Sequence, residues 1–194
     1  SFFVWFNSTR MHVWTRLAPK WEGSSGYGLY ADGMMEHDHH VGLLLDKLDE
    51  LGIADNTLVV YSTDNGSQTN TFPAGGAEPF RGEKGSTWEG GMRVPALIRW
   101  PGVVKEKTVI NDIYSHQDWL PTFLAAAGDS DISAKLKKGH RVGDKTFRVH
   151  IDGFDQSKAL AGKEPGQRNN IYYFDDNANF NAIRWNDWKI PFAW

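Results

Sequence analysis

Two adjacent side chains, Asp64 and Asn65, are the first candidates for chemistry in this sequence. They follow residues 57–63, an apolar run typical of a buried strand, and ligands of open α/β sheets bind where strands end. A carboxylate beside a carboxamide offers hard oxygen ligands, which suit Ca²⁺ or Mg²⁺ better than Zn²⁺. Asp-Asn-Gly is also a common turn sequence, so the tripeptide alone leaves a plain turn as the alternative.

A second candidate is Lys84, which lies in the glycine-rich stretch of residues 80–95, Phe-Arg-Gly-Glu-Lys-Gly-Ser-Thr-Trp-Glu-Gly-Gly-Met-Arg-Val-Pro. Glycines let the backbone approach a ligand closely, and a lysine there would present a cation to an oxyanion. A solvated loop lysine is the alternative that the residue type by itself favours. The pattern of the residues around Lys84 is therefore needed to choose between a ligand-binding lysine and a solvated one.

That pattern resembles the sulfatase family over residues 57–102. The likeness consists of a strand ending in Asp-Asn-Gly, a loop reading Gly-x-Lys-Gly-x-Thr-x-Glu-Gly-Gly-x-Arg-x-Pro, and a strand closed by Trp-Pro-Gly. It continues through residues 9–12, 36–49, 118–122 and 152–153, so it covers nearly the whole chain. The match is closest to bacterial arylsulfatase-like enzymes of the alkaline-phosphatase-like superfamily.

The resemblance implies a role for each candidate. Asp64 and Asn65 correspond to two ligands of a divalent cation, usually Ca²⁺ with Mg²⁺ possible, and Lys84 to the lysine that contacts the sulfate group. His12 corresponds to the histidine near the bridging ester oxygen. The chemistry agrees, because cations offset the charge on the sulfate oxygens and an imidazole can protonate the leaving group. We therefore predict His12 and Lys84 as catalytic and substrate-binding residues.

Sulfatases use a formylglycine nucleophile made from Cys, or sometimes Ser, in a Cys-x-Pro-x-Arg motif. The chain contains no cysteine and no such motif. We expect the formylglycine and the other metal ligands to belong to an N-terminal segment outside this sequence, which leaves about half a coordination sphere and a chain inactive alone. We further expect association with that N-terminal part or with copies of the chain, because a divided sheet exposes edges.

Two other functions stay open. One is a phosphate or phosphonate monoester hydrolase of the same superfamily, and the other is a structural fragment without activity. The histidine-rich cluster at residues 37–40 is not predicted to bind metal, because its side chains do not converge on one face of a helix. Asp38 in this cluster is instead predicted to be a paired, partly buried carboxylate.

The elements that must position these residues are of α/β type. We predict buried strands over residues 2–6 and 57–63 and a third strand over residues 94–100. We also predict helices over residues 29–51 and 117–127, and antiparallel strands at residues 171–174 and 188–190. The fold class is thus α/β: part of an alkaline-phosphatase-like mixed sheet flanked by helices, with the start of a small antiparallel C-terminal subdomain. Residues 1–150 would form the C-terminal portion of the catalytic domain and residues 151–194 the beginning of that subdomain.

The composition of the chain argues against nucleic acid as a partner and against a membrane span. A net charge of -3 gives none of the basic excess expected of a nucleic-acid binder. No apolar run approaches the ~20 residues of a membrane span. The resemblance implies a sulfate-ester small molecule or glycan as substrate and a periplasmic or secreted location.

Overall fold

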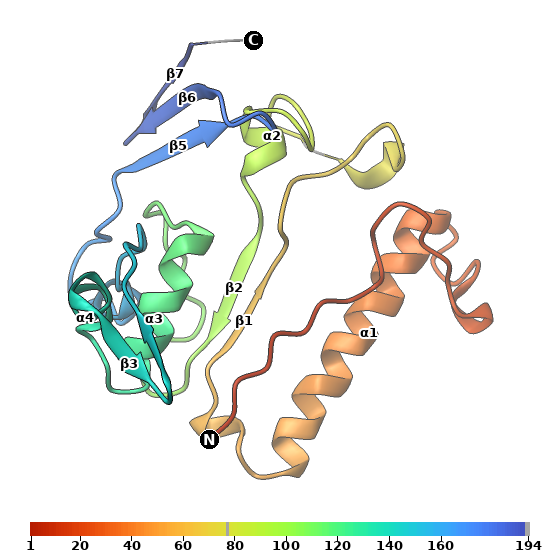
Figure 1. Ribbon diagram of the computed structural model, residues 1–194. Coiled ribbons are helices and arrows are strands. Elements are labelled where there is room, and N and C mark those ends of the chain that lie inside the picture. The colour runs from red at the N-terminus through yellow and green to blue at the C-terminus, as the bar shows by residue number, and fades with distance from the viewer. Residues whose placement is uncertain (77, 193–194) are drawn as a thin grey trace. The chain divides into compact units, whose positions relative to one another are not determined.

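The computed structural model describes residues 1–76 and 78–192 as two compact units, Ser1–Arg99 and the residues from Trp100 onward. The chain contains both helices and strands, and the strands of the described residues form three small antiparallel sheets (Figure 1). This is the mixed α/β class predicted from the sequence. The predicted boundary at residue 151, between the catalytic-domain portion and the C-terminal subdomain, is not tested by this division into two units and stays a prediction.

The long helix α1 (Leu29–Glu50) confirms the predicted helix and its end. Gly52 has φ of 64°, its N–H donates to the Asp49 carbonyl at 2.9 Å, and the Ile53 N–H donates to the Leu48 carbonyl at 3.0 Å. These are the two bonds of a Schellman motif, in which glycine accepts the left-handed conformation without steric cost. The helix therefore ends where the local sequence predicts.

Strands β1 (Val59–Ser62) and β2 (Ala96–Arg99) pair antiparallel, with Val59 opposite Arg99 and Ser62 opposite Ala96. Both lie inside the ranges predicted for strands, but the residues of β1 are half-buried where a buried strand was expected. A long connection joins them and contains two single-turn helices, η3 (Pro73–Gly75) and α2 (Glu89–Met92). The end of β1 and the start of β2 thus meet beside this connection.

The strand predicted over residues 2–6 is wrong. The described backbone forms no strand there, and the side chains are 54–80% exposed, where a buried strand was expected. An apolar run becomes a strand only when a neighbouring backbone takes up its N–H and C=O groups. The rest of this unit contains two short helical turns, η1 (Pro19–Trp21) and η2 (Ala54–Asn56).

The second unit holds short helices and two small sheets. The predicted helix over residues 117–127 is present as a 3-10 turn running into α3, and two of the three C-terminal strands match the predicted ones. Residues 129–150, where no element was predicted, contain a helix and a hairpin. In order, the elements are η4 (His116–Asp118), α3 (Trp119–Ala126), α4 (Ile132–Lys138), β3 (His140–Val142), β4 (Lys145–Phe147), α5 (Ser157–Leu160), β5 (Asn170–Phe174), β6 (Phe180–Trp185) and β7 (Trp188–Pro191).

A buried ion pair holds this second unit together. The Asp118 carboxylate, 1% exposed, accepts hydrogen bonds from Arg168 Nε at 2.9 Å and Arg168 Nη2 at 2.7 Å. It also accepts bonds from the backbone N–H groups of Ser115 at 3.1 Å and Phe154 at 2.9 Å. Gln156 Nε2 is a fifth donor at 3.3 Å, and together these bonds compensate for much of the desolvation of the buried carboxylate. No helix among the described residues is long and apolar enough to cross a membrane.

Candidate active site

The turn after β1 carries the two predicted metal ligands. Thr63 Oγ1 donates to the Asn65 carbonyl at 3.2 Å and lies 3.4 Å from Asp64 Oδ1. Asp64 is exposed and Asn65 is half-buried. The turn therefore leaves the Asp64 carboxylate accessible at the end of a strand.

A close backbone contact fixes this turn against the loop that carries Lys84. The Gly66 N–H donates to the Gly91 carbonyl at 2.8 Å, and the Lys84 N–H donates to the Ser67 carbonyl at 2.8 Å. A Cβ atom on Gly66 would lie 1.8 Å from the Gly90 carbonyl oxygen, far too close for two non-bonded atoms. The glycines on both sides thus permit the contact that joins the turn to the lysine loop.

Glu83, next to Lys84, anchors the same loop. Its carboxylate accepts a hydrogen bond from the Thr69 N–H at 2.6 Å and another from the Thr69 hydroxyl. The Thr69 hydroxyl bond lowers the pKa of Glu83, so the carboxylate stays ionised. Ser86 Oγ donates to the Glu83 carbonyl at 2.7 Å. Neither Glu83 nor Thr69 was predicted as a site residue; the only sequence signal was the position of Glu83 next to Lys84.

His12 lies in a separate tight turn of the same unit. Its carbonyl accepts hydrogen bonds from the Thr15 N–H at 3.1 Å and the Thr15 hydroxyl at 2.6 Å. Met11 and Trp14 have φ near 65°, values that non-glycine residues adopt rarely. Within residues 1–76 and 78–192, no hydrogen bond or ion pair joins the His12 side chain to Asp64, Asn65 or Lys84.

A buried carboxylate ties this turn to α1. Glu36, 1% exposed, accepts a hydrogen bond from Arg10 Nη2 at 2.9 Å, lies 2.9 Å from Arg10 Nε, and is 3.4 Å from the Ala18 N–H. The bond from Arg10 lowers the pKa of Glu36. The chain segments before and after His12 are thereby held on the helix.

The prediction for Asp38 is wrong. Asp38 is exposed, and it has no hydrogen-bond or ion-pair partner in the described part of the chain; the buried, paired carboxylate of this helix is Glu36, two residues earlier. A helix turns about 100° per residue, so a shift of two positions moves a side chain to the opposite face.

In the histidine cluster, His37 Nε2 lies 3.2 Å from the Tyr61 hydroxyl, and burial lowers the pKa of His37.

The turn after β1 offers a divalent cation two side-chain oxygen donors, one from Asp64 and one from Asn65. Asp64 and Asn65 offer the hard oxygens that Ca²⁺ and Mg²⁺ prefer, and no cationic side chain pairs with Asp64 among the described residues. No three His, Cys, Asp or Glu side chains gather into a metal site anywhere in that part of the chain. The turn therefore fits a cation in ligand type and would supply two of the six to eight ligands that Ca²⁺ takes.

Comparison with known proteins gives a family match. The family model described as Sulfatase matches residues 1–129. Steryl-sulfatase of Rattus norvegicus is 34% identical over 95% of this chain and 31% of its own length. Arylsulfatase A of Homo sapiens is 33% identical over 98% of this chain and 36% of its own length. The chain spans about a third of the length of these curated relatives.

Solved structures show the same relationship. PsFucS1 sulfatase from Pseudoalteromonas sp. superposes with a TM-score of 0.80 at 33% identity, covering 94% of this chain and 34% of that one. The structure of Ps i-CgsB in complex with k-i-k-neocarrahexaose gives a TM-score of 0.66 at 31% identity, covering 82% of this chain and 33% of that one. The fold is that of the sulfatases, whose architecture is alkaline-phosphatase-like.

Proposed function

This chain belongs to the sulfatase family, and we propose that the intact protein containing it hydrolyses sulfate monoesters, with Lys84 and His12 at the reacting centre and Asp64 and Asn65 as metal ligands. The observation that carries this proposal is the backbone contact between the Asp64–Asn65 turn and the Lys84 loop. Groups far apart in the sequence are joined there by hydrogen bonds at Gly66 and Ser67.

Each residue has a defined task. Lys84 places a compact positive charge beside the sulfate oxygens, whose negative charge otherwise repels a nucleophile. Asp64 and Asn65 hold the cation through a carboxylate and an amide oxygen. When bound, Ca²⁺ or Mg²⁺ would supply further positive charge, and a formylglycine outside this chain would supply the nucleophile.

His12 protonates the leaving oxygen as the S–O bond breaks. An imidazole can give a ring N–H proton to an oxygen within hydrogen-bond reach. General acid catalysis of this kind contributes on the order of 10²–10⁴ in rate. The hydrogen bonds from Thr15 to the His12 carbonyl and the Arg10–Glu36 pair restrict the backbone that carries this imidazole.

The test is hydrolysis of 4-nitrophenyl sulfate and 4-nitrophenyl phosphate by the intact protein. We expect the sulfate ester to be the better substrate, and Lys84→Ala to lower kcat/KM about 10²–10³-fold. Lys47→Ala, which removes an equal charge at the far end of α1, is the matched control and should change kcat/KM less than twofold. Preference for the phosphate ester would favour the phosphatase alternative, and equal losses for both variants would refute the role of Lys84.

Metal dependence is tested separately. Dialysis against a chelator should abolish activity, and Ca²⁺ or Mg²⁺ should restore it in the wild type. Asp64→Asn should raise the metal concentration that gives half-maximal activity, because a carboxylate ligand loses its charge. Activity that is indifferent to the chelator would remove the proposed metal site.

We extend the proposal to the compartment and the assembly. A periplasmic or secreted location follows from the likeness to bacterial arylsulfatase-like enzymes, and fractionation of the cells would test it. The chain expressed alone should be inactive and should self-associate, because its Phe2–Phe6 segment is exposed. A stable, active monomer in size-exclusion chromatography would contradict this.

A further inference from the structure

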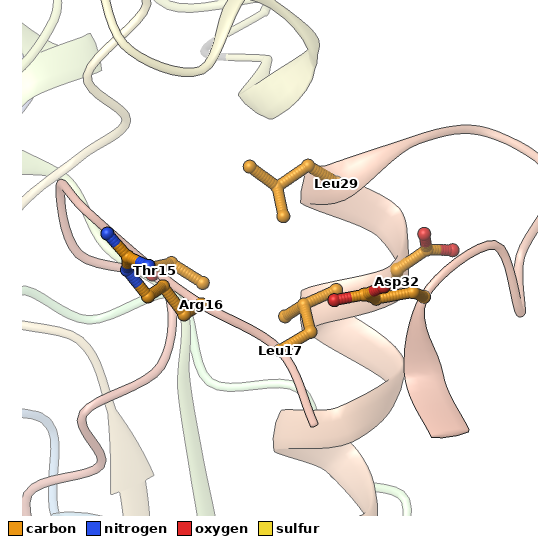
Figure 2. Close-up of a pocket in the computed structure, with 6 residues that line it drawn as sticks. Thr15, Arg16, Leu17, Leu29 and Asp32 are labelled. Carbon is orange, nitrogen blue, oxygen red and sulfur yellow. The ribbon is translucent and has the colours of Figure 1, made fainter. Parts of the chain in front are cut away.

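A cavity of about 490 Å³ lies in the first unit, beside the turn that carries His12 (Figure 2). Its size is within the range of small-molecule sites. Thr15 and Arg16 form one wall, and Leu29 and Asp32 of α1 form the other (Figure 2). Leu17 and Glu22 complete the lining. Nothing in the proposed reaction uses this cavity.

The wall formed by α1 and the preceding loop is held firmly. Asp32, 4% exposed, accepts hydrogen bonds from the Gly23 N–H and the Ser25 N–H, each at 2.8 Å, and from the Ser25 hydroxyl at 2.5 Å. These bonds, the Ser25 hydroxyl foremost, lower the pKa of Asp32. Both carboxylate oxygens are engaged, so Asp32 shapes the cavity and leaves ligand recognition to other groups.

Two charged groups are available to a ligand. Arg16 and Glu22 are exposed, and neither side chain has an ion pair or hydrogen bond within residues 1–76 and 78–192. A guanidinium binds a carboxylate or a sulfur oxyanion through two parallel hydrogen bonds. A carboxylate accepts hydrogen bonds from hydroxyl groups and repels a second anion. Arg16 therefore favours the anionic end of a ligand, and Glu22 favours an end that carries hydroxyl groups.

The rest of the lining fits a sugar ring better than a wholly apolar molecule. Leu17 and Leu29 offer apolar contact to ring carbons. A sterol filling this cavity would desolvate Arg16 and Glu22 without giving either a partner, which costs free energy. A hydroxylated ring with an anionic substituent satisfies both.

We propose that this cavity binds a sugar unit that carries its own oxyanion, with Arg16 as the residue that recognises it. The inference rests on the proposed function for its place in the substrate: Arg16 follows His12 by four residues, so the unit would adjoin the sulfate ester that is cleaved. The oxyanion is a uronate carboxylate or a second sulfate, which share the recognition by a guanidinium.

The test is calorimetric titration of the intact protein with methyl glucoside and methyl galactoside, their uronates, and their 6-deoxy-6-sulfonates, which no sulfatase can cleave. The charged probes should bind about tenfold more tightly than the neutral ones, as a charge-assisted pair would give. Arg16→Ala should abolish this preference and Arg16→Lys should retain part of it. Lys47→Ala, the charge-matched control, should retain all of it.

Equal affinity for charged and neutral probes, or a preference that survives in Arg16→Ala, would overturn the inference. The stronger binder of the uronate and the sulfonate identifies the natural oxyanion. These titrations involve no turnover, so they are independent of the 4-nitrophenyl sulfate assay. If the protein fails to hydrolyse 4-nitrophenyl sulfate but still prefers the charged probes, the hydrolase proposal is refuted and the binding proposal is not.

Discussion

Replacing Glu36 by Gln removes the charge of a carboxylate that is 1% exposed while keeping the size of its side chain. The partner, Arg10, contacts this carboxylate twice at 2.9 Å and comes from the segment just before His12. The substitution therefore tests whether this pair holds the His12 turn on α1.

The expected loss of unfolding free energy is about 2–3 kcal/mol. Breaking a buried ion pair by removing one partner costs about 3–5 kcal/mol. The Arg10 side chain is 22% exposed, so water reaches the guanidinium and reduces this penalty. The Gln carbonyl still accepts one hydrogen bond, worth about 1 kcal/mol.

The assay is urea denaturation followed by tryptophan fluorescence, to which Trp21, 5.3 Å from the ring of His39, contributes. Glu50→Gln on the same helix is the matched control. Its pair with Lys47 is exposed, with side chains 65% and 57% accessible, and exposed pairs contribute about 0–1 kcal/mol. The two variants differ in burial and share the same chemical change.

Equal destabilisation by Glu36→Gln and Glu50→Gln would refute the reasoning, because burial would then make no difference. A double-mutant cycle with Arg10→Gln provides the second check. Residues in direct contact couple by about 0.5–3 kcal/mol, so strictly additive effects would show that Arg10 and Glu36 act independently.

Three further predictions concern packing and pH. Asp118→Asn should destabilise the second unit by about 3–5 kcal/mol in urea denaturation, because Arg168 would stay buried without its counter-charge. Gly66→Ala should lower kcat/KM for 4-nitrophenyl sulfate at least about tenfold, because its Cβ would displace the Gly90 carbonyl and with it the lysine loop. The pKa of Asp32 is lowered in the folded state, so its contribution to stability is complete above pH ~4 and is lost as pH falls through the folded pKa. Urea midpoints between pH 6 and pH 3 should therefore fall less steeply in Asp32→Asn.

Each control replaces a residue of the same type at a more exposed or more open position. Asp129 pairs with Lys135 on the surface, and Asp129→Asn should cost less than about 1 kcal/mol. A Cβ added at Gly42 would meet open space, so Gly42→Ala should leave kcat/KM unchanged and, within a helix, should not destabilise. Asp46, exposed on α1, serves for the pH series. A control that behaves like its test variant would contradict the corresponding prediction.

Local patterns in the sequence were sufficient for several elements. The apolar spacing over residues 29–50 predicted α1, and Gly52 predicted its end, because both depend on residues within a few positions of one another. The runs at residues 57–63 and 94–100 predicted β1 and β2 for the same reason. The motif around Asp64 and Lys84 indicated the family that the comparisons confirm.

Short or marginal patterns were not sufficient. Helix α4 has two buried apolar residues, Ile132 and Leu136, which give too little periodicity to recognise. Asp38 was placed on the buried side of α1, although Glu36 holds that position. A one- or two-residue error in helical phase cannot be detected until the packing partner is known, and the partner, Arg10, is 26 residues away.

The sequence by itself determined the family and the long, regular elements such as α1, β1 and β2, since residue type and local spacing are properties of the chain alone. The tertiary structure decided which residues meet. The contact of Gly66 with Gly91, the Arg10–Glu36 pair and the cavity at Arg16 each join segments that are distant in sequence. Such contacts depend on shape and burial, and these exist only after the chain has closed its loops and excluded water.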